Sequence, residues 1–193
     1  MGALKLETYT YDDYKHWEGD WELIYGHPVP LYGKVCHTTA ISPAPYFQHQ
    51  KVGSNFLVEL SKSLDDCPNC EVVYECDWIL EEDLVVCPDL ILTCNHNIEE
   101  HYITKRPEIV VEISSKSTAQ KDETTKLEIY ESEKVPYYVL AYPKYKKLKI
   151  YEFDKKKNRY KNLGSYTDEK FTFKNIKCKD ITIDIKNIFK RIK

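Results

Sequence analysis

The chain lacks any run of eighteen apolar residues, and this absence excludes a transmembrane helix. Residues 1–7 contain no apolar stretch of the kind found in secretory signals, so we expect a cytoplasmic protein without a membrane partner. The sequence also has no internal repeat and no low-complexity linker. Its 193 residues, 42% hydrophobic and 31% charged, are typical of one globular domain spanning residues 1–193.

The seven cysteines are odd in number and irregular in spacing, which argues against a disulfide framework. Cys67 and Cys70 have the spacing of half a zinc site, but structural zinc needs a second ligand pair at matching spacing. The later pair, Cys87 and Cys94, lies in and just after an apolar run. We therefore expect reduced cysteines, with zinc at Cys67 and Cys70 as the alternative. Cys87 reads as a small buried apolar residue.

The net charge of −3 conceals two halves of opposite sign. Residues through Pro143 hold 11 Lys and Arg against 25 Asp and Glu, whereas residues from Lys144 onward hold 17 against 6. Such a basic segment is typical of a polyanion-binding surface, although lysine-rich turns are also ordinary solvated surface. If the segment contacts DNA, we expect charge reversal of Lys155, Lys156 and Lys157 to weaken binding.

Hydrophobic periodicity predicts an α/β fold, with a mixed β-sheet flanked by helices, an N-terminal hairpin and C-terminal antiparallel strands. The strand, helix and strand over 108–141 predict a right-handed parallel crossover. A helix following Pro43-Ala44-Pro45 is expected to bury Phe47, Val52, Phe56, Leu57, Leu60 and Leu64 on one face. The other expected elements are helices at 10–17 and 118–131 and strands at 21–25, 29–35, 72–80, 84–92, 108–114, 135–141, 147–153, 158–163 and 170–173.

Two carboxylates interrupt apolar, strand-like runs, Asp89 within 85–92 and Glu112 within 109–114. A carboxylate is costly to bury unless it is paired or holds a metal ion. Two of them on neighbouring strands can share a divalent cation such as Mg²⁺, with Mn²⁺ as a substitute, because hard cations prefer oxygen ligands. The alternative is a plain buried salt bridge between Glu112 and Lys126.

The lysine on the following helix completes a hydrolytic site. A cation held by Asp89 and Glu112 would polarise a phosphoryl oxygen and acidify its bound water. Lys126 can reach back to stabilise developing negative charge or to orient that water. Glu22 is a further candidate acid, because it stands in the otherwise apolar run of residues 21–24. We expect a metal-dependent phosphodiester hydrolase, with hydrolysis of another phosphoester left open.

Several of these motifs stand together in a recognisable order. The chain resembles the Uma-type restriction endonuclease family of the PD-(D/E)XK nuclease superfamily over about Tyr11 to Phe153. The resemblance is carried by Trp21 to Gly26, His49-Gln50, Pro88-Asp89, Val111 to Ser114, Asp122, Lys126, Tyr130 and Val135 to Tyr138.

The resemblance implies a restriction-endonuclease-like core at about residues 20–143 that hydrolyses DNA with Mg²⁺ or Mn²⁺. It implies Asp89, Glu112 and Ile113 as metal ligands and Glu22 as an early acid, while His49 is expected on a helix surface. A homodimer would suit the cutting of two strands. Ser114 stands where the superfamily's usual lysine lies, and Tyr142 stands where the family has aspartate. The alternative is a catalytically silent nucleic-acid-binding or assembly module.

Overall fold

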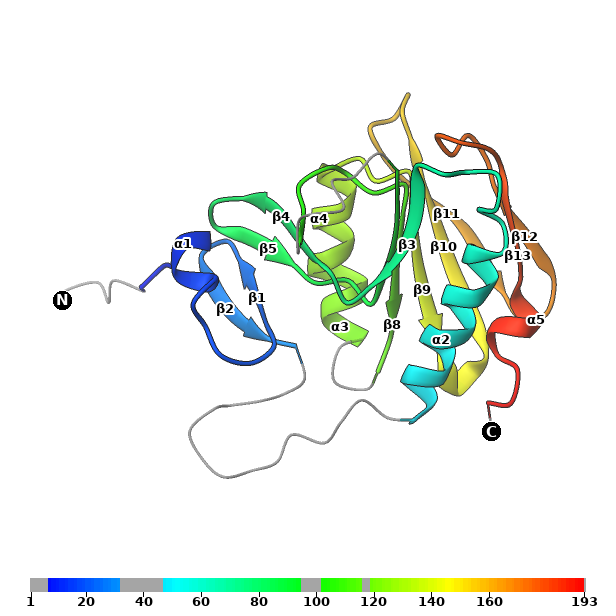
Figure 1. Cartoon of the computed structure of the whole chain (residues 1–193), viewed down its shortest axis with the longest axis horizontal. Coiled ribbons are helices and arrows are strands. Elements are labelled where there is room, and N and C mark those ends of the chain that lie inside the picture. The colour runs from blue at the N-terminus through cyan, green and yellow to red at the C-terminus, as the bar shows by residue number, and fades with distance from the viewer. Residues whose placement is uncertain (1–6, 32–46, 95–101, 116–118, 193) are drawn as a thin grey trace.

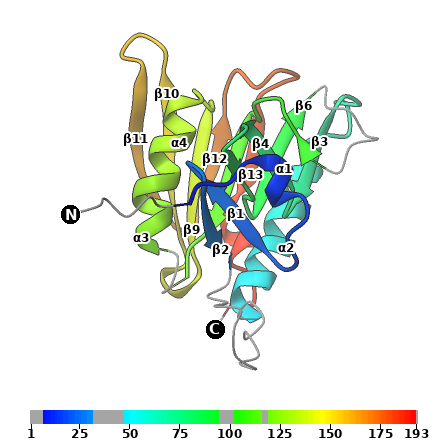
Figure 2. The same cartoon turned by 90° about the vertical axis from the view of Figure 1, so that its left-hand side faces the viewer.

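A computed structural model describes residues 7–31, 47–94, 102–115 and 119–192. Its strands form three sheets, with the orders β11-β10-β9-β8-β6-β3, β2-β1-β5-β4-β7 and β12-β13 (Figures 1 and 2). The elements are α1 (Tyr11–Tyr14), β1 (Trp21–Ile24), β2 (His27–Pro30), α2 (Phe47–Ser61), β3 (Cys70–Tyr74), β4 (Asp77–Glu81), β5 (Leu84–Val86), β6 (Leu90–Cys94), β7 (Tyr102–Ile103), β8 (Ile109–Ile113), α3 (Ala119–Lys121), the π-helical turn η1 (Asp122–Lys126), α4 (Leu127–Ser132), β9 (Tyr137–Tyr142), the 3₁₀ turn η2 (Pro143–Tyr145), β10 (Lys147–Asp154), β11 (Arg159–Tyr166), β12 (Lys170–Phe173), β13 (Ile181–Asp184) and α5 (Ile185–Ile188).

The six-stranded sheet is covered on both faces, and β8 lies inside it (Figure 1). β8 runs parallel to β9, which confirms the predicted parallel crossover. Ile109, Val111 and Ile113 of β8 pack in a hydrophobic cluster with α2, α5 and the β12–β13 sheet. Val110 packs on the opposite face, in a cluster with α4 and the five-stranded sheet. Because side chains alternate along a strand, Glu112 shares the face of Val110 and points toward α4.

The expected strands 72–80 and 84–92 are each interrupted, so the prediction of two continuous strands is wrong. Residues 72–80 are divided into β3 and β4 at Glu75-Cys76, and residues 84–92 are divided into β5 and β6 at Cys87-Pro88-Asp89. The halves belong to different sheets. Glu75 adopts a left-handed backbone with φ 47°, and its N–H donates to the Asp89 carbonyl at 3.0 Å. Pro88 has no N–H to donate, which favours a strand break there. Asp89 therefore lies where the chain crosses between the two sheets.

Other expected elements differ in detail. The helix expected at 118–131 contains a π-helical turn, and β12 pairs with β13 rather than extending the β10–β11 meander. On α2, Val52, Phe56 and Leu60 are buried as predicted, but Phe47 is 75% exposed because it lies at the first turn. Residues 32–35 and Pro43 to Pro45, also covered by predictions, lie outside the described residues. No described helix is long and apolar enough to cross a membrane.

Four cysteines form two disulfides, Cys67–Cys178 and Cys70–Cys94, so the prediction of reduced cysteines is wrong for them. The register of β3 and β6 places Cys70 directly opposite Cys94. Cys178 lies 111 residues beyond Cys67 and reaches it through the connection between β12 and β13. Linear spacing carries no sign of either pairing, because both depend on tertiary contacts. Cys87 is a buried thiol, as predicted.

Candidate functional site

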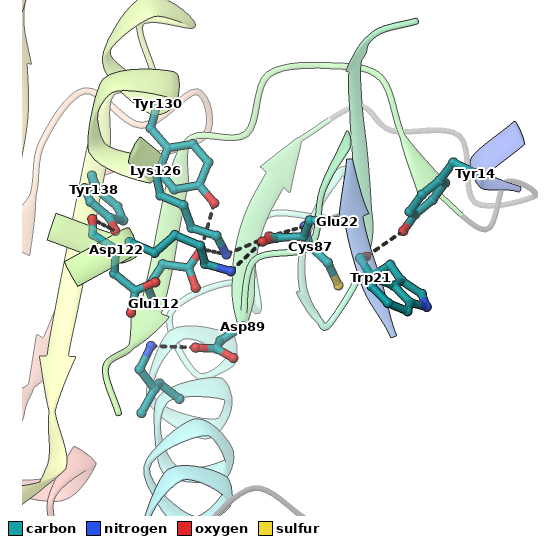
Figure 3. Close-up of polar contacts among 12 residues, drawn as sticks. Tyr14, Trp21, Glu22, Cys87, Asp89, Glu112, Asp122, Lys126, Tyr130 and Tyr138 are labelled. Atoms are coloured by element: carbon teal, nitrogen blue, oxygen red, sulfur yellow. Dashed lines mark hydrogen bonds and ion pairs between the residues drawn. The ribbon is translucent and has the colours of Figure 1, made fainter. Parts of the chain in front are cut away.

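The four charged residues of the predicted site come from four separate parts of the chain and lie near one another (Figure 3). Glu22 lies on β1, Asp89 precedes β6, Glu112 lies on β8 and Lys126 ends the π-helical turn η1. Their exposed fractions are 0% for Glu22, 2% for Lys126, 3% for Glu112 and 9% for Asp89. The charged groups are therefore almost fully withdrawn from water, and Asp89 is the most accessible of the four.

Lys126 links two carboxylates. Its Nζ lies 2.7 Å from Oε1 of Glu112 and 2.8 Å from Oε1 of Glu22. Glu22 also contacts Lys121 Nζ at 2.8 Å and accepts the Cys87 backbone N–H at 2.9 Å. Because burial of an ion without partners is strongly unfavourable, these contacts explain how the charges are tolerated inside the protein. The salt bridge between Glu112 and Lys126, the structural alternative from the sequence, is present.

Glu112 has a second donor on the same face of β8. The buried Tyr130 hydroxyl of α4 donates to Glu112 Oε1 at 2.7 Å. Burial raises the pKa of Tyr130, and the Glu112 charge raises it further, so the phenol remains a proton donor. Tyr130 stands four residues after Lys126, a spacing that places both side chains on one side of a helix. The site therefore draws two of its polar groups from one helical face.

Asp89 is held by the main chain of β8 and by α2. Its Oδ2 accepts the Ile113 N–H at 2.6 Å, and its Oδ1 lies 3.2 Å from His49 Nε2. His49 is buried, which corrects the prediction of a helix-surface residue. The spacing of His49, Val52 and Phe56 carried this signal, because it matches one buried helical face. Among the described residues, no group hydrogen-bonds to His49 Nδ1.

The pKa values of the network follow from burial and from its unequal neighbours. Burial raises the pKa of the Glu112 carboxyl; Lys126 opposes this shift, whereas the Asp89 carboxylate adds to it. Burial also favours neutral Glu22, but Lys126 and Lys121 outweigh it and lower the pKa of that carboxyl. Burial alone would lower the pKa of Lys126, yet Glu112 and Glu22 hold it well above its usual value. Lys126 and Glu22 are therefore charged at neutral pH.

Burial disfavours the charged form of His49, but the hydrogen bond and charge of Asp89 outweigh this effect and raise the pKa of the imidazole. Contact with Asp89 therefore favours the protonated form of His49.

The π-helical turn allows both Lys121 and Lys126 to reach Glu22. Lys121 and Lys126 are five residues apart, and on an ordinary α-helix their side chains would diverge by about 140°. A wider π turn, with hydrogen bonds five residues apart, brings such positions onto one side. The buried Tyr138 hydroxyl donates to the Asp122 carbonyl in this turn at 2.9 Å. Sequence reasoning missed Lys121 because an ordinary helix gives no reason to place it here.

The side chains of this site do not by themselves form a complete set of metal ligands. Among the residues that the structure describes, with Cys67, Cys70, Cys94 and Cys178 held in disulfides, no group of three or more His, Cys, Asp or Glu side chains is placed to hold a metal ion. Asp89 is held beside Glu112 by the main chain, because its carboxylate accepts the N–H of Ile113, the residue after Glu112. Any cation at this position would therefore depend on backbone oxygen and water as well as on these two carboxylates.

The fold resembles a solved structure, and the sequence matches a family model. The chain resembles the structure of a "putative nuclease" of the DUF820 group from Anabaena variabilis, with a TM-score of 0.69 over 93% of this chain and 97% of that one. Their sequences are 13% identical, so this likeness concerns the fold. No curated protein sequence matches the chain. The Uma2 family model, described as "Putative restriction endonuclease", matches residues 12–172, and the chain therefore belongs to the Uma2 family.

Proposed function

We propose that this protein is a Mg²⁺-dependent endonuclease, also able to use Mn²⁺, that hydrolyses phosphodiester bonds of DNA. The main support for the proposal is the position of Asp89 beside Glu112. Asp89 Oδ2 accepts a 2.6 Å hydrogen bond from the N–H of Ile113, the residue that follows Glu112. Membership of the Uma2 family and the nuclease fold support the same reaction class.

The residues present fit a hard divalent cation. In a β-strand the N–H and C=O of one residue point to the same side, so the Ile113 carbonyl faces the side on which Asp89 lies. Asp89, Glu112 and the Ile113 carbonyl would supply three oxygen ligands, the type that Mg²⁺ prefers, with water completing its shell. When bound, the ion would polarise a phosphoryl oxygen and acidify a water molecule.

The chain's own groups then have separate tasks. Lys126 carries a positive charge that can stabilise negative charge developing on the phosphate or orient the attacking water. Glu22 holds Lys126 in place through the 2.8 Å contact, and Tyr130 orients Glu112. His49 orients Asp89 from α2. Glu22 is therefore proposed as a positioning acid, and Asp89 and Glu112 as ligands.

Replacement of Asp89 by asparagine tests this assignment. We expect the wild-type protein to bind Mg²⁺ or Mn²⁺ in calorimetry and to nick supercoiled plasmid in a metal-dependent manner. Asp89→Asn should weaken metal binding and slow nicking at least about 100-fold, because one anionic ligand is lost. Asp65→Asn is the matched control, because it removes an exposed carboxylate that is not part of the site. Equal nicking by Asp89→Asn and wild type would contradict the proposal.

One specific observation favours a second function. Lys126 bonds to both Glu112 and Glu22, and the described side chains include no three-ligand metal group. The same network would suit a nuclease fold that serves as a catalytically silent nucleic-acid-binding or assembly module. Calorimetry separates the two functions, because absence of Mg²⁺ and Mn²⁺ binding by the wild type would favour the silent module.

The structure divides the basic segment into two groups of lysines at opposite ends of β10. Lys147 pairs with Tyr142 of β9, and β9 also pairs Ala141 with Ile113 of β8, so Lys147 lies at the site's end of the sheet. The turn joining β10 to β11 lies at the other end from α3 (Figure 1). Along β10, Asp154 is about 17 Å beyond the level of Glu112 at the rise of an antiparallel strand.

Exposed residues near η2 are better placed to contact DNA at the site than the lysines of the β10–β11 turn. Tyr145 is 61% exposed, and the Nζ atoms of Lys144 and Lys147 lie 5.3 and 5.5 Å from the centroid of its ring. Lysines bind phosphates, and an exposed aromatic ring can stack on a base. We define Lys144, Lys146 and Lys147 as the η2 lysines and propose that they contact the DNA backbone beside the site.

Charge reversal of the η2 lysines should affect DNA binding more than reversal at the hairpin tip. Changing all three to glutamate is expected to reduce the slope of log affinity against log salt by about 3, since each phosphate contact contributes about 0.9. The same change at Lys155, Lys156 and Lys157 is the matched control and should reduce the slope by less than about 1. Fluorescence anisotropy with a labelled duplex at several salt concentrations measures both. A larger effect from the hairpin tip would contradict this placement.

A further inference from the structure

Four cysteines from three segments meet beyond the end of α2. Cys67 lies in the turn before β3, Cys70 begins β3, Cys94 ends β6, and Cys178 lies between β12 and β13. The Cα atoms are 5.9 Å apart for Cys67 and Cys178 and 4.0 Å apart for Cys70 and Cys94. A single cavity is lined by Cys67, Pro68, Asn69, Cys70, Cys94, Lys177 and Cys178.

We propose that this four-cysteine cluster is a zinc site when its two disulfides are reduced. Four thiolates in a tetrahedral arrangement are the ligand set of many structural zinc sites, and soft sulfur ligands select zinc over Mg²⁺. Cys67 and Cys70 have the two-residue separation of a zinc-binding turn. The tertiary structure supplies the second pair, Cys94 and Cys178, which linear spacing does not reveal.

The backbone already brings the four side chains together. The Cys70 N–H donates to the Cys67 carbonyl at 3.0 Å, which closes a tight turn between the first two ligands. Cys94 stands directly opposite Cys70 in the β3–β6 register. Zinc–sulfur bonds of about 2.3 Å place tetrahedral sulfur atoms about 3.8 Å apart. Within each bonded pair the Cα atoms are 5.9 and 4.0 Å apart, close enough for both sulfur atoms of a pair to bind one ion.

Burial and charge also suit a zinc–thiolate centre. Cys67, Cys70 and Cys94 are buried, whereas Cys178 is exposed and offers an entry path for the ion. Zn²⁺ with four thiolates carries a net charge of about −2. Lys177 lines the same cavity and can offset part of that charge, and its Nζ also lies 3.9 Å from Glu108. Lys179 is paired with Asp66 at 3.3 Å.

Oxidation and zinc binding compete for the same four sulfur atoms. Each disulfide takes one cysteine from the Cys67–Cys70 turn, so none of the four sulfurs is a thiolate in the oxidised form. An added dithiol gives two electrons and two protons to each disulfide and is itself oxidised to a disulfide. Zn²⁺ then replaces the four thiol protons, which are released to solvent.

Cobalt substitution tests the proposal without any variant. The full-length protein is reduced with a dithiol, freed of reductant without oxygen, and titrated with Co²⁺ and then with Zn²⁺. We expect one Co²⁺ per chain with the strong thiolate-to-metal absorption of a tetrahedral four-sulfur site, bleached by one equivalent of Zn²⁺. The unreduced protein should show none of this absorption. Reduced protein that gives no thiolate-to-cobalt absorption would overturn the proposal and leave two structural disulfides only.

Variants assign the ligands. In the reduced state, Cys94→Ser and Cys178→Ser should each lower zinc affinity about 100-fold, because four ligands share a large binding free energy. Cys76→Ser, which changes a half-buried cysteine outside the cluster, should leave affinity unchanged. Asp89→Asn should also retain the cobalt spectrum, which separates this centre from the proposed nuclease site. Loss of the spectrum in Cys76→Ser or Asp89→Asn, with both cluster variants unaffected, would contradict the assignment.

Discussion

Glu112→Gln is expected to abolish metal-dependent cleavage while the protein remains folded. The amide keeps the size of the carboxylate and can still accept hydrogen bonds from Lys126 and Tyr130 through its oxygen. It loses the negative charge that would hold the cation beside Asp89. Plasmid nicking should fall at least about 1000-fold, because a bound metal contributes several kcal/mol to stabilisation of the transition state.

Glu22→Gln is the matched control for this prediction. Both carboxylates are buried and contact the same Lys126 Nζ, at 2.7 Å for Glu112 and 2.8 Å for Glu22. Only Glu112 is adjacent to the Ile113 peptide that bonds to Asp89. Calorimetry should therefore show Mg²⁺ binding retained in Glu22→Gln and lost in Glu112→Gln. The reverse result would assign Glu22 as the ligand, and equal retention in both would leave Glu112 in a structural salt bridge.

Lys126→Met is expected to destabilise the folded protein by about 3 kcal/mol, because removal of one partner from a buried ion pair leaves its counterions uncompensated. Lys126 serves Glu112 and Glu22 together, so two carboxylates lose a partner in one substitution. Urea unfolding measures the change in the free energy of unfolding. Lys121→Met is the control, because Lys121 contacts Glu22 at the same 2.8 Å but is partly exposed, and its loss should cost less than about 1 kcal/mol.

The destabilisation should depend on pH in a defined direction. A carboxyl whose folded pKa lies above its unfolded value favours folding at low pH, and this contribution is lost as pH rises through the folded pKa. Burial raises the pKa of Glu112, and Lys126 opposes the rise, so its removal enlarges the shift. The deficit of Lys126→Met should therefore be larger at about pH 9 than at about pH 6. Adding Glu22→Gln and Glu112→Gln should recover much of it, and a Lys126→Met protein as stable as wild type would contradict the network.

The apolar runs around Asp89 and Glu112 made the α/β fold and the convergence of these residues predictable. A carboxylate in such a run needs a partner when it is buried. This requirement drew attention to Asp89, Glu112 and Glu22, and it suggested Lys126 as a partner of Glu112. The weak alternation along 108–113 is typical of a strand buried on both faces, and all five residues of β8 are buried.

The breaks at Glu75 and Pro88 were not predictable, because each half of these apolar runs pairs with a different sheet. Residues 84–92 have a continuous strand pattern in sequence, yet β5 pairs with β1 and β4 while β6 pairs with β3 and β8. Local propensity cannot choose between such partners. The break matters to the site, since it frees Asp89 from a ladder and turns its carboxylate toward His49 and the Ile113 N–H.

Burial costs and side-chain alternation are local properties, so the order of residues was enough to show which charged groups need partners and which positions form the core. The pairing of Lys126 with two acids, the positions of Lys121 and His49, and the meeting of four cysteines depend on how distant segments pack together. Cys67 and Cys178 are separated by 111 residues, and their contact exists only because β12 and β13 pack on the sheet that α2 covers. Such long-range contacts depend on the packing of the whole chain, which no local pattern records.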